Sequence, residues 1–152
     1  MFAKGRFVSD PIHLELGAEG LDFKRADIEV YGIDQSGPSY EGRVFLNNPG
    51  ANADTPPTAD NGYAGSFHVY GYGIWPADVV KDAVHEGPEA PSAEQEGIRA
   101  PIQKEVIATE TVRRAAATGR DPIVTIVPVY HGHRHRDASD ALKLEGVKIV
   151  VR

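Results

Sequence analysis

The chain has 152 residues, 41% of them hydrophobic and 25% charged, and this length and composition predict a single globular domain over residues 1–152. The absence of cysteine excludes disulfides, thiolate metal sites and cysteine nucleophiles. No stretch approaches the ~20 consecutive apolar residues of a membrane span, and residues 1–10 lack the apolar core of an export signal. We therefore expect a soluble chain with no membrane partner, cytoplasmic by default.

The net charge of −6 is unevenly distributed along the chain. Residues 1–98 contain 6 Lys and Arg against 16 Asp and Glu, whereas residues 99–152 contain 10 against 6. An acidic first part repels a polyanion, and the basic residues of the second part are scattered, so no nucleic acid partner is expected. The asymmetry leaves two interpretations open: docking to another copy or to an oppositely charged partner, or mixing of both signs on one folded surface.

The first half of the chain predicts a series of strands. Early strands are expected around 2–8 and 13–16, and the period-two alternation of residues 27–34 predicts a half-buried strand. A turn at 35–39 leads to the next strand, which ends at an Asn-Asn-Pro-Gly sequence over 47–50. Alternation divides that strand into two sides, with Tyr40, Gly42, Val44 and Leu46 on one and Glu41, Arg43 and Phe45 on the other.

A glycine-rich strand is predicted over residues 64–72, after the tight-turn sequence Asn61-Gly62. Phe67, Val69 and Gly71 would share one side of the strand. The other side of the strand would carry four polar or aromatic residues: Ser66, His68, Tyr70 and Tyr72. Its glycines indicate bends, bulges or the close approach of another backbone: Gly65, Gly71 and Gly73.

The second half begins with an irregular, acidic, proline-rich loop over about 74–101. A strand is then expected at 103–108, followed by a helix over about 110–117 that Thr109 would cap and Gly119 would stop. The loop is expected to contain at most a short helical turn, so this helix is the one substantial helix expected.

Two further strands complete the prediction. The β-branched run 123–130 should be buried on both sides, with Pro128 near a sheet edge, and residues 147–151 supply the last strand. The pattern as a whole predicts a mainly β chain: an antiparallel β-sandwich of about seven to eight strands with one short helix.

Several separated motifs resemble one known module, in this order: Ser36, Ser39 and Tyr40; Arg43 to Pro49; Tyr63 to His68 with Gly71; Thr109; and Val124 to Pro128. They are similar to the C-terminal β-sandwich of bacterial tyrosinase-like, type-3 copper proteins. One departure is that Tyr72 to Pro76 stands where relatives often carry His-Gly and a cysteine-bearing loop. The histidine-bearing helices that hold copper in those proteins have no counterpart in this sequence.

The resemblance implies an accessory or assembly module that packs over a copper domain and shields its active-site entrance. It implies no catalytic residue and no cofactor of the module's own, and a role as part of, or partner to, a tyrosinase-like copper oxidase. The expected partner is a type-3 copper domain or a second copy of the chain. The sequence itself agrees with a module that has no catalytic residues, because it contains no Walker phosphate loop, no Gly-x-Ser-x-Gly elbow and no His-Glu-x-x-His helix.

An alternative function rests on three histidines at alternate positions: His131, His133 and His135. On an extended segment their imidazoles would point to one side, where they could chelate copper or zinc. His68, His85 or Asp137 would have to complete the ligand set. Arginines interleave the histidines, which is typical of a solvated hairpin tip, so a small metal-binding or copper-handling protein remains the alternative hypothesis.

Four residues are candidates for a protein interface: Trp75, Tyr70, Tyr72 and His68. Tryptophan and tyrosine are enriched among interface hot spots, and His68 would share a strand face with the two tyrosines. Each also has a structural interpretation: Trp75 could pack under its loop, and His68 could hydrogen-bond a neighbouring strand. Arg43 is expected to pair with Glu41 or with a carboxylate on the next strand.

Overall fold

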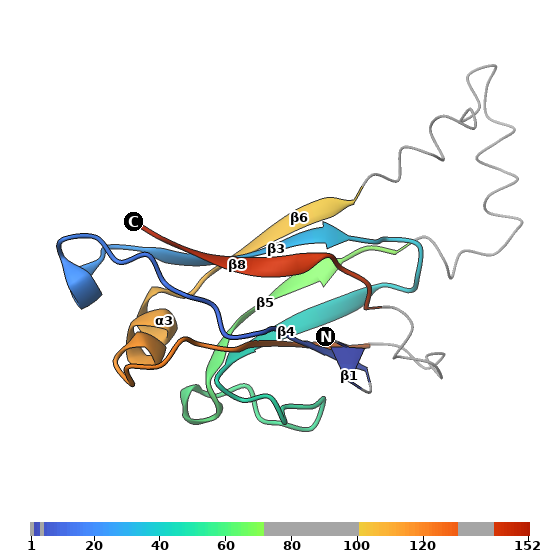
Figure 1. The fold of residues 1–152 in the computed structure, drawn as a ribbon. Coiled ribbons are helices and arrows are strands. Elements are labelled where there is room, and N and C mark those ends of the chain that lie inside the picture. The colour runs from blue at the N-terminus through green and yellow to red at the C-terminus, as the bar shows by residue number, and fades with distance from the viewer. Residues whose placement is uncertain (1, 4, 72–100, 131–141) are drawn as a thin grey trace, which may run out of the picture.

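The computed structural model describes residues 2–3, 5–71, 101–130 and 142–152, which form two antiparallel sheets stacked face to face (Figure 1). The larger sheet has the order β1-β2-β7-β4-β5, with bounds Phe2–Ala3, Arg6–Val8, Val124–Val129, Tyr40–Leu46 and Tyr63–Val69. The smaller sheet has the order β6-β3-β8, with bounds Ile102–Ile107, Ala26–Ile33 and Gly146–Val151. The predicted mainly β sandwich is confirmed, whereas the predicted irregular loop over 74–101 lies almost entirely outside the described residues.

The helix α3 spans Thr109–Ala116, close to its predicted bounds, and buries Val112 and Ala115 against the sheets. The expected cap is wrong, because Ala108 is the N-cap and no side chain caps the helix. Thr109 Oγ1 instead accepts a hydrogen bond from the backbone N–H of Ala26 at 3.2 Å, which ties the helix to β3. Short 3₁₀ helices occur at η1, Gly20–Asp22, and η2, Ala59–Asn61. No helix in the described part of the chain is long and apolar enough to cross a membrane.

The N-terminal segment differs from the sequence prediction. The expected strand at 2–8 is divided into β1 and β2 by a turn at Gly5, whose φ is 75°. No strand forms at 13–16: Leu14 is buried there while Leu16 remains 40% exposed, and the nearby Ile12 N–H donates to the Pro122 carbonyl. This segment therefore contributes Leu14 to the core without joining a sheet.

The core lies between the two sheets, and the predicted facing of β4 and β5 is confirmed. Tyr40, Val44 and Leu46 are at most 3% exposed, and Phe67 and Val69 are buried on the same side. Gly42 is needed beside them because the ring of Phe67 covers the position that a Cβ would take. Phe45 points to the opposite side but is also fully buried, in a second cluster with Ala51 and Val127. The strand β7 is thus buried on both sides, as its sequence predicts.

Gly65 marks a close approach between the sheets. Its φ is +138°, and the ladder between β4 and β5 shifts register between Val44 and Phe45. A Cβ at Gly65 would lie 2.6 Å from Cγ1 of Val106 on the other sheet. Gly71 also has a structural role, since a Cβ there would overlap the carbonyl of Gly37. The predicted close approach at the glycine-rich strand is confirmed at these two positions, and Gly73 lies outside the described residues.

Pro128 lies near a local edge of the larger sheet, as the sequence predicts, although its strand is an interior one. It belongs to β7, which lies between β2 and β4, and it is paired with Gly42 of β4. Proline is tolerated there because β2 pairs with β7 only at Thr125 and Ile126. On that side Pro128 lies beyond the ladder, so its missing N–H removes no strand hydrogen bond.

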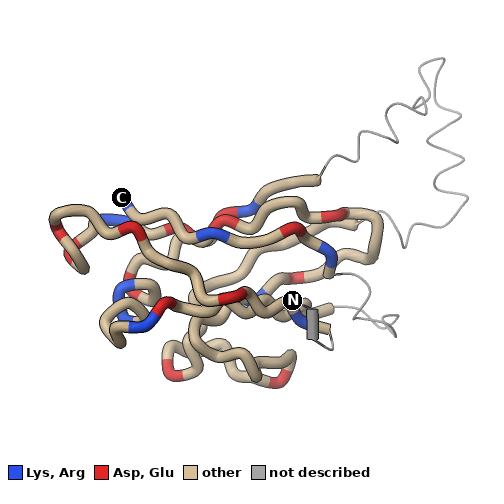
Figure 2. The backbone as a smooth tube through the Cα atoms, in the orientation of Figure 1, with Lys and Arg blue, Asp and Glu red and all other residues tan. Residues whose placement is uncertain are grey.

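Folding brings the acidic first part and the more basic second part of the chain together. On the smaller sheet, Asp27 accepts from Arg152 at 3.0 Å, and Glu29 lies 3.9 Å from the ammonium of Lys148. Lys, Arg, Asp and Glu are interspersed over the described backbone (Figure 2). Of the two interpretations of the charge asymmetry, mixing of signs on one surface therefore describes this sheet.

Candidate interaction surface

Two of the four candidate interface residues lie in the described part of the chain, on the solvent side of the larger sheet. His68 lies on β5, directly opposite Glu41 of β4, and is exposed. Tyr70 follows β5 and is 73% exposed, the highest value among the large hydrophobic residues described. The amide Nε2 of Gln35 donates to the Tyr70 carbonyl at 3.2 Å and so fixes the backbone from which the ring projects.

A charged pair borders these residues. Arg43 Nε donates to Glu41 Oε1 at 3.2 Å along β4, with side chains only 21% and 15% exposed, as the sequence predicts. Val129 of β7, paired with Glu41 across the ladder, is partly buried. We name the β4–β5 face by six residues: Glu41, Arg43, Ser66, His68, Tyr70 and Val129. An exposed aromatic ring beside an imidazole and a paired charge is typical of a protein-binding patch.

The other predicted site residues lie outside the described residues. Tyr72, Trp75 and the three histidines of the metal hypothesis, His131, His133 and His135, cannot be placed on the β4–β5 face or anywhere else. Among the residues that the structure does describe, no three His, Asp or Glu side chains are grouped as a metal would require. The metal-binding hypothesis therefore stays a prediction from the sequence.

A buried tyrosine lies on the core side of β4, beneath the β4–β5 face. The ring of Tyr40 packs 6.4 Å from Phe67 in an edge-on arrangement and 6.4 Å from Tyr130. Its hydroxyl is buried and has no hydrogen-bond partner among the residues that the structure describes. Burial, followed by the charges of Tyr130 and Asp34, raises the pKa of Tyr40 above the ordinary value of 10.0.

Tyr40→Phe should leave the fold intact and raise its stability by up to about 1 kcal/mol at neutral pH, because it removes a buried hydroxyl without a partner. The raised pKa favours the neutral phenol in the folded state. The stabilisation that the neutral Tyr40 phenol gives to the folded state is therefore complete below pH 10. It is lost as the pH rises further, because the tyrosine of the unfolded chain ionises first. Urea unfolding at neutral and alkaline pH should show wild type losing stability relative to Tyr40→Phe. Tyr70→Phe, at an exposed ring, is the control and should match wild type throughout.

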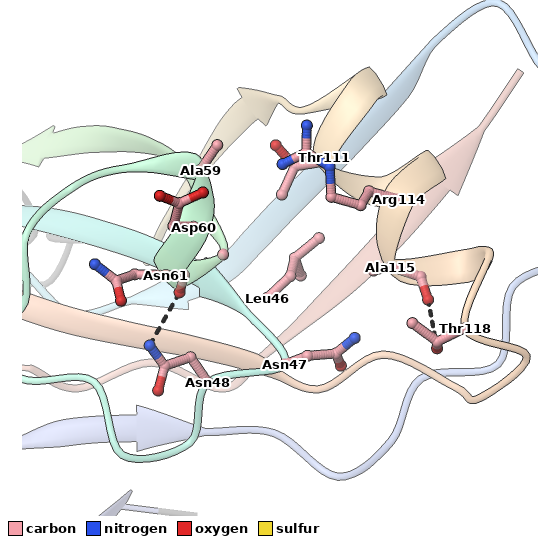
Figure 3. A pocket seen from close by; sticks show the side chains of 11 residues that line it. Leu46, Asn47, Asn48, Ala59, Asp60, Asn61, Thr111, Arg114, Ala115 and Thr118 are labelled. Atoms are coloured by element: carbon pink, nitrogen blue, oxygen red, sulfur yellow. Dashed lines mark hydrogen bonds between the residues drawn. The ribbon is translucent and has the colours of Figure 1, made fainter.

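A pocket of about 280 Å³ opens at the far end of β4, between η2 and α3 (Figure 3). It is lined by 11 residues: Leu46, Asn47, Asn48, Ala59, Asp60, Asn61, Gly62, Thr111, Arg114, Ala115 and Thr118. Sequence patterns do not predict it, because three separate segments supply its walls. The one local signal is the Asn-Asn pair that ends β4, since asparagine favours the left-handed backbone conformation that Asn47 adopts, with φ 57°.

The two asparagines hold the pocket walls in place. Asn47 Oδ1 accepts from the Ile123 N–H at 3.0 Å, and Asn48 Nδ2 donates to the Asn61 carbonyl at 2.9 Å. These bonds fix the end of β4 against β7 on one side and against η2 on the other. The pocket is therefore part of the folded framework.

Solved structures of a polyphenol oxidase have a similar fold. Latent aurone synthase, a polyphenol oxidase from a natural source, aligns with TM-score 0.53 and 15% identity over 99% of this chain and 25% of that chain. The recombinantly expressed latent enzyme aligns at 0.52 and 15%, over 99% and 25%. Its co-crystal with hexatungstotellurate(VI) aligns at 0.51 and 16%, over 99% and 25%. The chain has the fold of part of a polyphenol oxidase.

The likeness covers the whole of this chain but only about a quarter of the length of the solved structures. At this identity it shows a shared fold, and it agrees with the family resemblance carried by the strand motifs. No protein-family model and no curated protein matches the sequence.

Proposed function

We propose that the chain is a non-catalytic accessory β-sandwich, which packs against a type-3 copper domain and covers the entrance to its active site. The observation that carries the proposal is the fold, because 99% of the chain aligns with about a quarter of a latent polyphenol oxidase. The strand motifs support it, since they resemble the sandwich that follows the copper domain in tyrosinase-like proteins. In this proposal the copper domain supplies the oxidation chemistry and the sandwich supplies recognition.

The β4–β5 face is the surface proposed to make the contact. Tyr70 offers a large ring that loses little conformational freedom on binding, and its backbone is already fixed by Gln35. His68 adds a second exposed ring, and the pair of Glu41 and Arg43 supplies a polar rim. An anchor surrounded by such a rim is the usual anatomy of a protein interface.

Binding can be measured by isothermal titration of the purified chain into a type-3 copper domain from the same source organism. Tyr70→Ala should weaken binding at least thirtyfold, the loss of about 2 kcal/mol expected for a hot-spot residue, and His68→Ala should weaken it less. Ile107→Ala is the matched control, because Ile107 is 63% exposed but lies on the smaller sheet. This variant should bind like wild type.

Two results would contradict the proposal. Absence of measurable binding by wild type would remove the copper domain as partner. Loss of binding in Ile107→Ala with full binding in Tyr70→Ala would move the contact to the smaller sheet. Sedimentation of the chain alone should give a monomer. A dimer that Tyr70→Ala disrupts would mean instead that the β4–β5 face serves self-association.

A further inference from the structure

The pocket between η2 and α3 has two walls of opposite charge. Asp60 stands on the η2 side and Arg114 on the α3 side, with Leu46 between them (Figure 3). Both charged side chains are exposed, and among the described residues neither makes a hydrogen bond or an ion pair. By contrast, the neighbouring Arg113 of the same helix is fully engaged, with Glu110 and with the carbonyls of Leu21 and Phe23.

The pocket holds further unused hydrogen-bonding capacity. The side-chain oxygen of Asn47 is occupied by the Ile123 N–H, which fixes the amide orientation and leaves both Nδ2 hydrogens available. Donors therefore come from Arg114 and Asn47, while the carboxylate acceptor comes from Asp60. A ligand that satisfies both walls must carry an anionic group and a cationic group at once.

The floor and the size limit the rest of the ligand. Leu46 and Ala115 are 3% and 6% exposed and, with Ala59, supply aliphatic surface. A volume of about 280 Å³ lies just below the range of about 300–1,000 Å³ that is usual for small-molecule sites, so the ligand must be small. The lining contains no aromatic ring, which disfavours a sugar, and Asp60 disfavours an anion without a positive group.

We propose that this pocket binds a free amino acid with a short aliphatic side chain. The α-carboxylate accepts from the guanidinium of Arg114 and from Asn47 Nδ2, and the α-ammonium donates to the carboxylate of Asp60. The aliphatic side chain packs on Leu46 and Ala115. This site is separate from the β4–β5 face, so the proposal of a ligand does not depend on the proposed accessory function.

The test is an NMR titration of the ¹⁵N-labelled chain with L-valine. Saturable changes in the amide chemical shifts are expected for residues in η2, at the end of β4 and in α3. L-Valinamide lacks the carboxylate and isovalerate lacks the ammonium, so each should bind at least tenfold more weakly than valine. Arg114→Gln and Asp60→Asn should weaken valine binding by a similar factor, whereas isovalerate should bind Asp60→Asn at least as tightly as it binds wild type, because the repelling carboxylate is gone.

Arg120→Gln is the matched control, because Arg120 is an exposed arginine just beyond the same helix and does not line the pocket. It should bind valine like wild type. Equal binding of valine, valinamide and isovalerate, or shifts that never saturate, would overturn the proposal. So would variants at Arg114 and Asp60 that fold normally, as judged by their spectra, and bind valine as tightly as wild type.

Discussion

Gly65→Ala should lower the free energy of unfolding by about 2–6 kcal/mol. The new Cβ would lie 2.6 Å from Cγ1 of Val106, so the valine side chain or one of the sheets must shift, and overpacking of this kind costs about 1–3 kcal/mol. The backbone adds a second penalty, because φ at Gly65 is +138°, a conformation that L-residues rarely adopt, at a cost of about 1–3 kcal/mol. Urea denaturation followed by circular dichroism measures the change.

Gly50→Ala provides the matched control. Gly50 has no positive φ, and a Cβ there would meet no atom within 4 Å, so stability should change by less than about 0.5 kcal/mol. Val106→Ala tests the contact itself, since it removes the methyl groups that a Cβ at Gly65 would meet. The double variant should be more stable than the two single changes predict, by about 1 kcal/mol. Strict additivity would mean that the sheets do not meet at this point.

Asp27→Ala should lower the free energy of unfolding by about 2–4 kcal/mol. The carboxylate is fully buried on β3 and accepts from Arg25 Nε at 2.8 Å and from Arg152 Nη1 at 3.0 Å. The loss comes from two hydrogen bonds to a buried carboxylate, each worth about 1.5–3 kcal/mol, and it is limited because the two guanidinium groups are 44% and 54% exposed and become hydrated once the carboxylate is gone. Asp27 also raises the pKa of Arg25, through its hydrogen bond first and its charge second.

Asp27→Asn separates charge from volume at this position. It keeps the size of the side chain and one acceptor oxygen, so its loss of stability should fall between those of wild type and Asp27→Ala. Asp54→Ala, at an exposed loop residue, is the control and should change stability by less than about 0.5 kcal/mol. Thermal and urea unfolding would contradict the expected role of Asp27 if the alanine variants at Asp27 and Asp54 behaved alike.

Strand faces could be predicted because alternation is a local property of the chain. Phe67 and Val69 point into the core and His68 and Tyr70 point out, as period two requires. Phe45 shows the limit of this pattern: it lies on the side of β4 opposite to Tyr40 and Val44, as alternation predicts, yet packing with Ala51 and Val127 buries it completely. Residues beyond the local pattern decided its burial, so the second cluster could not be predicted.

Of the two candidate functional surfaces, the β4–β5 face depends on a local pattern and the pocket depends on distant segments. Half of the predicted interface, His68 and Tyr70, follows from one strand, and alternation predicts that the two residues share a side. The alternative interpretation of His68 as a partly buried strand residue is wrong, because both side chains are exposed. The pocket needs the end of β4, η2 and α3 together, and nothing in the neighbourhood of Asp60 or Arg114 marks either residue as facing the other. Similarly, Thr109 has the chemistry of a helix cap, but Ala26 of a distant strand offers it a backbone N–H instead.

The most direct test of the accessory function is oxygen uptake with a catechol in three samples: the chain with added Cu(II), a type-3 copper domain from the same source organism, and the two together. The chain alone should consume no oxygen above the level of free Cu(II), and a stoichiometric amount of it should slow uptake by the copper domain, with Tyr70→Ala relieving that effect. Saturable turnover by the chain itself, or unchanged uptake in the mixture, would contradict the account.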